Sequence, residues 1–402
     1  MPDLVIRSID ALVTMGGGSG LGVVNEAAVA MEGGRVSWVG PDAQAPSAAF
    51  EVDGTGCIGL PGLVDCHTHT VFAGSRASEF RDRLGGRSYT EILEEGGGIL
   101  RTVRATREAT EDSLARVAAQ RLAAMAAGGV TTVEVKSGYG LTASDEAKML
   151  RAARRAGDDS GVRVLTTFLG AHTVPAELRG NREAYVRDVI DAQLPSVASH
   201  ADFIDAYVDR GAFTVDEGRR ILAAGKKAGL GVRVHAEQVA HTGAAQMAAE
   251  LGALSADHLE RLDEAGAEAM ARAGTVAVLL PGAMTYLRDT PPPVAVLRAH
   301  GVPMAVATDF NPGSSPVRDL WSCATLACLS MGLTVEEALR GITRVAADAL
   351  GRPDLGRVAV GAAGDLVLMR PPPGEPCDPA VLVQYLGSHE PALVIRDGAL
   401  RG

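Results

Sequence analysis

The residues best suited to chemistry in this chain are histidines and one aspartate near the ends of apolar segments. His67 and His69 lie two apart in DCHTH, and residues two apart in a β-strand face the same side. Both side chains could therefore bind one metal ion. His235, His258 and Asp309 follow near the ends of later apolar segments. Imidazole and carboxylate groups together are typical ligands of a catalytic metal ion.

An HxH pair alone is a weak signal, because such histidines are often ordinary core or surface residues. The distribution of all nine histidines is more informative. Six lie in or just after predicted strand ends and three elsewhere, namely His67, His69, His172, His235, His241 and His258 against His200, His300 and His389. This convergence predicts a functional site.

The elements that must position these residues alternate between strand-like apolar runs and amphipathic helical stretches. Eight runs have strand character, over residues 63–70, 130–138, 162–173, 203–211, 232–238, 254–260, 275–283 and 302–310. We therefore predict an α/β fold, a (β/α)8 TIM-like barrel whose site lies at the C-terminal strand ends. A doubly wound sheet also alternates strands and helices, but it favours a glycine-rich turn where this chain has HTHT.

Helix starts support this alternation. Thr214 precedes Glu217 by three residues, and Thr334 precedes Glu337 by three. This spacing is typical of a capping box, in which the two side chains satisfy each other's backbone N–H groups.

The two ends of the chain have a different character. Residues 1–60 contain short β-like stretches with glycine breaks, and similar stretches lie at 364–370 and 392–398. We expect a small β-sandwich-like domain built from both termini, residues 1–60 plus 355–402, beside a metal-dependent hydrolase barrel over 61–354.

Composition limits the possible partners. With 402 residues and 47% hydrophobic content the chain can bury a large core. A formal net charge of −11 leaves no basic surplus for nucleic acid or an anionic membrane surface, so we expect a small-molecule substrate. The sequence has no signal-peptide pattern or long apolar run, and its five cysteines lack CxxC spacing. These features predict a cytoplasmic protein with reduced thiols.

Several long motifs resemble a known family. Four resemble the metal-dependent amidohydrolase superfamily, namely PGLVDCHTH, VHAEQ, SADHLE and ATDFNPG. Five others narrow the resemblance to the imidazolonepropionases, which open an imidazolone ring in histidine degradation, namely GSRASEFRDR, GGGILRTVRATR, VEVKSGYGL, TFLGAHTVP and DFNPGSSP. The resemblance covers nearly the whole chain.

The resemblance implies one divalent or trivalent metal ion per subunit, zinc or iron, held by His67, His69, His235 and Asp309. It implies hydrolysis of the ring amide of 4-imidazolone-5-propanoate to N-formimidoyl-L-glutamate by metal-activated water. Asp309 would then carry a proton from the water to the leaving ring nitrogen, and His258 would stabilise the oxyanion or orient the nucleophile. A homodimer is the assembly expected of the family.

A propionate tail calls for a guanidinium that can form two parallel hydrogen bonds, and Arg76 matches the family's position. The resemblance implies five further substrate-binding residues, Tyr139, His172, Asn311, Gly313 and Ser314, and we add Gln238 on its chemistry. Arg76 and these five residues each also have an ordinary interpretation, as a surface charge, a core residue or a turn residue. For Asp309 the ordinary interpretation is a helix N-cap.

Position 238 separates two kinds of chemistry. Related deaminases carry a glutamate there that moves protons to the leaving amine, whereas this chain has Gln238. An amide cannot cycle a proton, so Gln238 favours ring opening over ammonia release. Strict strand alternation would instead place Glu237 on the face of His235, and Glu237 remains a rival. The alternatives to ring opening are a ring aminohydrolase and a non-catalytic barrel that acts as an assembly scaffold.

Two further features have limited roles. In some amidohydrolases a carbamylated lysine on the fourth strand bridges two metals, but segment 203–211 carries Asp205 and Asp209 and no lysine. We therefore expect one metal ion, with Lys136 acting electrostatically or packing its stem. The glycines at 96–98 lack the frame of a nucleotide-binding loop and are expected in a flexible loop beside the substrate.

Overall fold

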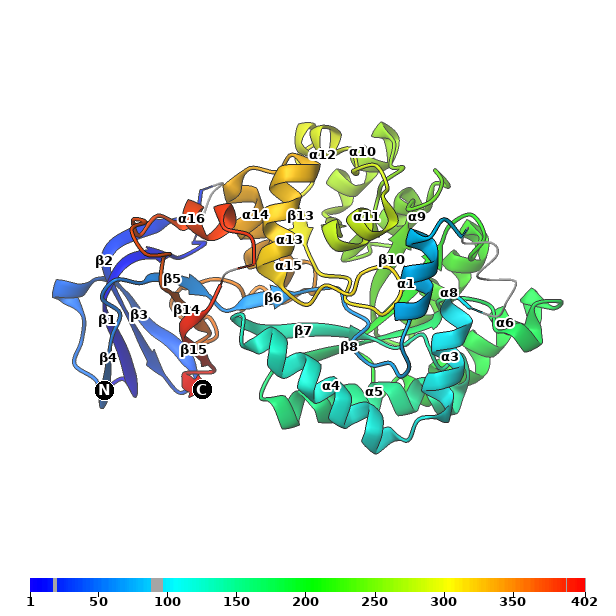
Figure 1. Cartoon of the computed structure of the whole chain (residues 1–402), viewed down its shortest axis with the longest axis horizontal. Coiled ribbons are helices and arrows are strands. Elements are labelled where there is room, and N and C mark those ends of the chain that lie inside the picture. The colour runs from blue at the N-terminus through cyan, green and yellow to red at the C-terminus, as the bar shows by residue number, and fades with distance from the viewer. Residues whose placement is uncertain (17–19, 88–96, 388, 402) are drawn as a thin grey trace.

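The computed structural model describes residues 1–16, 20–87, 97–387 and 389–401. It contains two eight-stranded sheets, one at the left end of the molecule in Figure 1 and the other in its middle and right parts. Of the predicted glycine loop at 96–98, Gly96 lies outside the described residues.

One sheet is a parallel barrel whose strands follow chain order from β6 to β13. Its strands are β6 (Leu63–Asp65), β7 (Val130–Lys136), β8 (Arg163–Ala171), β9 (Phe203–Val208), β10 (Gly231–Ala236), β11 (Ser255–His258), β12 (Val276–Leu279) and β13 (Met304–Val306). Seven of these strands lie within predicted runs, and β10 begins one residue before its run, so the prediction of a (β/α)8 barrel is confirmed.

The barrel closes between its first and last strands through backbone and side-chain hydrogen bonds, which together we call the seam. Beyond the ends of β6 and β13, Asp309 N donates to His67 O at 2.9 Å, and His69 N donates to Phe310 O at 2.9 Å. Below these bonds, the Asp65 carboxylate accepts hydrogen bonds from Thr308 N at 3.1 Å and from the Thr308 hydroxyl at 2.6 Å. The Asp65 side chain thus takes the place of backbone hydrogen bonds at the point where the segment of His67 and His69 meets the segment of Asp309.

Helices surround this barrel (Figure 1). The longer ones are α3 (Ile99–Glu108), α4 (Glu111–Ala126), α5 (Ala143–Ser160), α8 (Val215–Lys227) and α10 (Glu264–Ala273). The shorter ones are α1 (Ala77–Leu84), α6 (Arg182–Asp188), α7 (Leu194–Val197), α9 (Ala244–Glu250), α11 (Pro281–Leu287), α12 (Val294–Ala299), α13 (Leu320–Leu326), α14 (Val335–Gly341), α15 (Arg344–Asp348) and α16 (Pro379–Gln384). Both predicted capping boxes are present, at the starts of α8 and α14.

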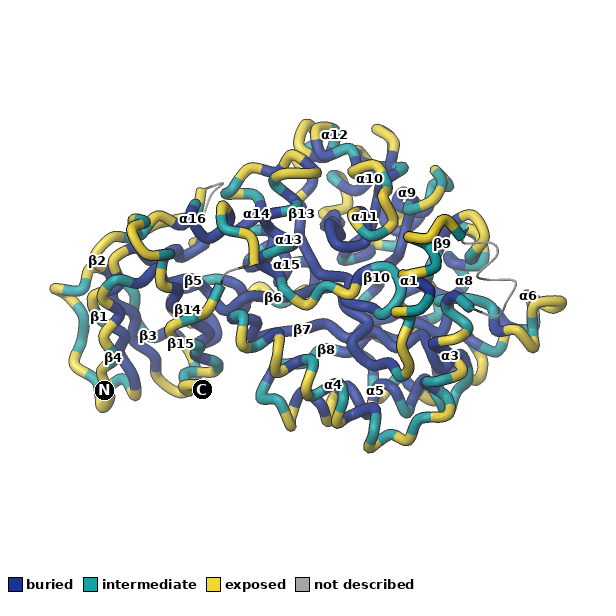
Figure 2. The backbone as a smooth tube through the Cα atoms, viewed as in Figure 1, coloured by how far each residue is buried: buried dark blue, intermediate teal, exposed yellow. Residues whose placement is uncertain are grey.

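The core lies between the barrel strands and these helices, where Figure 2 shows the strands as mostly buried. Apolar residues on the inner faces of the helices fill this layer, among them Leu122, Leu150, Ile221, Met270 and Leu339. Burial of such side chains is the main favourable contribution to folding. No helix in the described part of the chain is long and apolar enough to cross a membrane.

The second sheet joins the two ends of the chain, as predicted for a small β domain. Its strands are β1 (Leu4–Val13), β2 (Val23–Glu32), β3 (Arg35–Pro41), β4 (Phe50–Asp53), β5 (Ile58–Pro61), β14 (Leu366–Met369), β15 (Pro391–Arg396) and β16 (Ala399–Arg401). The N- and C-terminal segments meet where β5 pairs antiparallel with β14. All these strands belong to one sheet, and the boundaries at 60 and 355 stay a prediction.

Candidate active site

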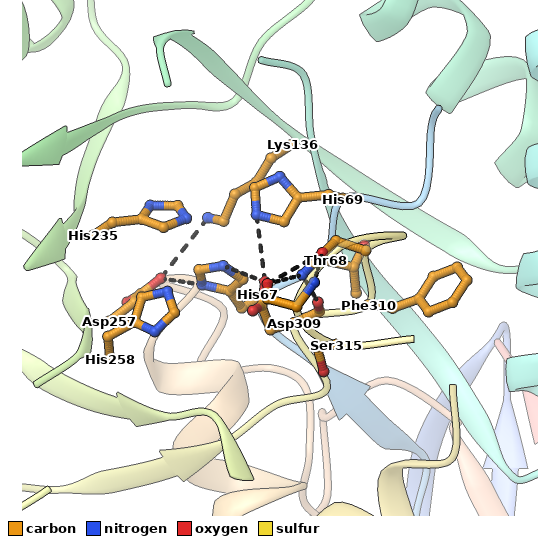
Figure 3. Close-up of polar contacts among 12 residues, drawn as sticks. His67, Thr68, His69, Lys136, His235, Asp257, His258, Asp309, Phe310 and Ser315 are labelled. Carbon is orange, nitrogen blue, oxygen red and sulfur yellow. Dashed lines mark hydrogen bonds and ion pairs between the residues drawn. The ribbon is translucent and has the colours of Figure 1, made fainter. Parts of the chain in front are cut away.

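The histidines singled out from the sequence meet at the C-terminal end of the barrel. His67, His69 and His235 each offer a ring nitrogen, and these atoms all lie within 4.8 Å of one another. The Nε2 atoms of His67 and His69 each lie 3.4 Å from Asp309 Oδ1. All four side chains are buried, and Figure 3 shows them facing one another. The structure therefore brings together the four predicted ligands.

Two of these histidines are oriented by carboxylates from other strands. His67 Nδ1 lies 2.6 Å from Asp257 Oδ2, and His235 Nδ1 lies 3.1 Å from Asp205 Oδ1. A carboxylate at Nδ1 leaves Nε2 as a lone-pair donor, which is the arrangement of metal-binding histidines. The Nε2 atoms of His67 and His235 are indeed buried without a hydrogen-bond partner in the described structure. Such unpaired nitrogens fit a metal ion.

Burial keeps the clustered histidines neutral. It lowers the pKa of His67 and His69 well below the ordinary value, and it lowers the pKa of His235 despite the opposing effect of Asp205. Neutral imidazole is the form that binds a metal ion.

Lys136 belongs to a buried ion network beneath this cluster and does not line the pocket. Its Nζ lies 2.8 Å from Glu134 Oε1, 2.8 Å from Asp205 Oδ2 and 3.8 Å from Asp257 Oδ2. Burial opposes its charge, but the carboxylates of Asp205 and Glu134 outweigh burial and raise the pKa of Lys136. Lys136 is therefore an ammonium ion that holds the carboxylates behind the histidines, and Arg233 supports Asp257 from 3.1 Å.

Sequence reasoning missed the roles of Asp257 and Arg233 and gave Asp205 none. A signal was nevertheless present, because charged residues inside apolar strand segments are unusual unless they are paired. Glu134, Arg233 and Asp257 all occur in such segments and are fully buried.

The ends of β11 and β13 have unusual backbone conformations. His258 has a φ of 80° and Asp309 a φ of 51°, in the left-handed region that non-glycine residues rarely adopt. The His258 ring lies 5.4 Å from that of His235 and 5.8 Å from that of His67. Burial raises the pKa of Asp309 to about 7.

The backbone conformation determines which of Glu237 and Gln238 faces the pocket. Glu237 has a φ of 57°, which breaks strand alternation directly after β10. Its carboxylate turns into the next loop, where it accepts a hydrogen bond from Gly243 N at 2.7 Å. Gln238 instead lines the pocket, and its Oε1 accepts a hydrogen bond from the Tyr207 hydroxyl at 3.0 Å.

A pocket of about 770 Å³ opens above the cluster. Every substrate-binding residue predicted from the sequence lines it, namely Arg76, Tyr139, His172, Gln238, Asn311, Gly313 and Ser314. His258 and Asp309 line it as well, whereas His67 lies deeper. The pocket therefore combines the candidate metal ligands with groups that can bind a small polar molecule.

Tyr139 and His172 form one wall as neutral groups. Their rings lie 5.3 Å apart, and His172 stacks on His69 at 5.0 Å. Burial lowers the pKa of His172 to about 3 and raises the pKa of Tyr139. This wall can therefore stack against a flat ring and exchange hydrogen bonds with it without adding charge.

The residues after β13 form a turn that also lines the pocket. Asn311 Oδ1 accepts hydrogen bonds from Gly313 N and Ser314 N, both at 2.8 Å. These three residues are thus turn residues and pocket residues at once.

Sequence reasoning also missed four arginines of the pocket lining, Arg83, Arg179, Arg182 and Arg210. With Arg76 they make this pocket rich in cationic groups, although the chain carries a net charge of −11. Such a pocket favours an anionic ligand. For Arg83 a signal existed, since it lies in the same GSRASEFRDR motif as Arg76.

Comparison with known proteins extends this description. A family model described as the amidohydrolase family matches residues 58–400. The chain is 50% identical over 384 residues to an imidazolonepropionase of Cupriavidus pinatubonensis, a match that covers 94% of this chain and 90% of the relative. It is 53% identical over 348 residues to that of Ectopseudomonas mendocina, which covers 85% of each chain.

Solved structures share the fold at low identity. The zinc complex of atrazine chlorohydrolase from Arthrobacter aurescens has a TM-score of 0.74 at 19% identity and covers 99% of this chain and 94% of that one. A zinc-bound adenosine deaminase from Xanthomonas campestris has a TM-score of 0.77 at 19% identity and covers 99% and 92%. These likenesses concern the fold alone.

Proposed function

Because this chain belongs to the amidohydrolase family, and within it to the imidazolonepropionases, we propose that it hydrolyses the ring amide of 4-imidazolone-5-propanoate. The product is N-formimidoyl-L-glutamate, a step of histidine degradation. The observation that carries the proposal is Gln238 in the pocket lining, where related deaminases carry a glutamate that moves protons to the leaving amine.

One metal ion would be held by His67, His69, His235 and Asp309. The unpartnered Nε2 atoms of His67 and His235 support this assignment. When bound, the ion supplies Lewis acidity toward the ring carbonyl and makes water more acidic. Zinc and iron both suit three imidazoles and one carboxylate, and elemental analysis of protein purified without added metal distinguishes them.

The chain's own residues then move the protons. Asp309 accepts a proton from the attacking water and returns it to the ring nitrogen as the carbon–nitrogen bond breaks, so that the carbonyl carbon becomes that of a carboxyl group, which ionises to solvent. His258 faces the same space and stabilises the oxyanion that forms at the carbonyl oxygen.

Different residues bind the two parts of the substrate, its propionate tail and its ring. Arg76 pairs with the propionate tail, and Tyr139 and His172 contact the ring. Gln238 holds the polar edge of the ring through its amide. Asn311, Gly313 and Ser314 complete the binding site from the turn after β13.

We also propose a cytoplasmic homodimer, because this assembly is expected of the family and because the five cysteines lack the spacing of a disulfide framework. For the chain's organisation we propose a barrel domain over residues 61–354 and a β domain over 1–60 plus 355–402. The shared terminal sheet supports this division.

Turnover of two substrate classes tests the function. Metal-loaded protein should remove the ultraviolet absorbance of freshly made imidazolonepropionate without releasing ammonia, and it should not deaminate purine or pyrimidine rings. Ammonia release from such a ring would favour the aminohydrolase. No turnover of imidazolonepropionate by fully loaded protein would refute the proposal.

A further inference from the structure

We infer that Glu79 is a positioning residue that fixes the guanidinium of Arg76 so that its terminal edge receives the carboxylate tail of the substrate. The inference deepens the proposed function and rests on it for the identity of the tail. It assigns a role to a buried glutamate of α1 that makes no contact with the candidate metal ligands in the described structure.

Glu79 is held from two elements. Arg76 is the N-cap residue of α1, and its Nε donates to Glu79 Oε2 in an ion pair across one helical turn. The same carboxylate accepts a hydrogen bond from Gly98 N, at 3.3 Å to each oxygen, where α3 begins. Arg101 adds a cation 3.9 Å from Oε1. Only 6% of the surface of Glu79 is exposed, so burial and these contacts together restrict its side chain.

Gly313 fixes the other side of the guanidinium. A methyl group built on Gly313 would lie 3.0 Å from Arg76 Nη1 and 3.3 Å from Cζ, closer than most carbon contacts in proteins. The guanidinium therefore packs directly on the backbone of the turn after β13. Arg83 closes the same corner by donating from Nη2 to Gly313 O at 3.3 Å.

This geometry selects which edge of Arg76 remains for a ligand. Glu79 takes Nε, and the two terminal nitrogens have no hydrogen-bond or ion-pair partner within the described ranges. Arg76 lines the pocket. Two parallel N–H groups at the terminal edge match the two oxygens of a carboxylate. Glu79 thus orders a side chain that would otherwise have to be immobilised when the ligand binds.

A purely structural role is the competing explanation, because Glu79 also joins α1 to α3. The two roles differ in what they do to selectivity for the tail. Loss of a structural link weakens every ligand equally, whereas loss of Arg76 orientation weakens only ligands with a carboxylate tail.

The test uses Glu79→Gln, which keeps the side-chain shape and removes the charge. The probe is imidazole-4-propionate, which has the tail but no ring amide to hydrolyse, compared with its carboxamide in calorimetric titrations of the metal-loaded protein. We expect the Kd of the carboxylate to rise about tenfold and that of the carboxamide to change less than about twofold. In an Arg76→Gln background, Glu79→Gln should have no further effect.

Two other variants keep the test decisive. Glu183→Gln breaks an exposed ion pair with Arg220 away from the pocket and should change neither Kd. Gly313→Ala disturbs the guanidinium from its other side and should weaken the carboxylate selectively, even if Glu79→Gln does not fold. Equal weakening of both probes, or additive effects with Arg76→Gln, would overturn the inference. Because the probes are not cleaved, failure of imidazolonepropionate turnover would overturn the proposed function alone.

Discussion

The histidines of the candidate site differ in the charge that their surroundings impose. Burial lowers the pKa of His67, His69 and His172, so these rings are neutral. For His258 burial also favours the neutral ring, but the carboxylates of Glu260 and Asp309 outweigh it and raise the pKa. His258 is thus the ring best suited to meet negative charge at the substrate carbonyl.

Glu260→Gln tests this assignment through the pH dependence of kcat/KM. Glu260 Oε1 lies 3.9 Å from His258 Nδ1, and its removal lowers the pKa of His258. An imidazolium is lost as pH rises through its pKa, so the alkaline fall in kcat/KM should move to lower pH in the variant. Glu264→Gln, at an exposed position, serves as the control. An alkaline limb that stays in place would contradict the assignment.

At the scale of elements, the site depends on how the first and last strands close the barrel. Neither strand is long, and the carboxylate of Asp65 supplies acceptors that a regular ladder would take from the backbone. Thr308, which donates to it, directly precedes Asp309. The seam therefore sets the distance between Asp309 and the HxH pair, although Asp65 itself does not line the pocket.

Replacement of Asp65 should reveal this role. In Asp65→Ala the buried N–H and hydroxyl of Thr308 lose their acceptor, and each unsatisfied donor costs about 1–3 kcal/mol. We expect a melting temperature several degrees lower and faster loss of metal to a chelator. Asp65→Asn keeps one acceptor oxygen, so its melting temperature and its rate of metal loss should lie between those of the parent protein and those of Asp65→Ala. A variant with the stability and metal retention of the parent protein would refute the seam's importance.

At the scale of the whole molecule, sequence reasoning succeeded where information is local. Each barrel strand has its own apolar run, and HxH spacing follows from strand geometry. It failed where partners come from distant segments: His67 and Asp257 are 190 residues apart, and nothing near either residue indicates that they pair. The positive φ of Glu237 was equally inaccessible, because periodicity assumes that the strand continues.

The difference between local information and contacts of distant segments also explains which features of the pocket could be predicted. The resemblance identified Arg76 and the turn after β13 separately, but only the fold brings Gly313 against the guanidinium. Likewise, the sharing of one small β domain by both chain ends was expected from their β character, whereas their union in one sheet and the pairing of β5 with β14 required the structure.

The central claim is that one metal ion at His67, His69, His235 and Asp309 activates the water that opens an imidazolone ring. Titration of metal-free protein with zinc or ferrous iron, with turnover of imidazolonepropionate measured at each addition, tests it most directly. Activity should rise in proportion to bound metal and level off at one equivalent per chain, and Asp309→Asn should stay folded without turnover. Full activity without metal, a need for two equivalents, or an active Asp309→Asn would contradict it.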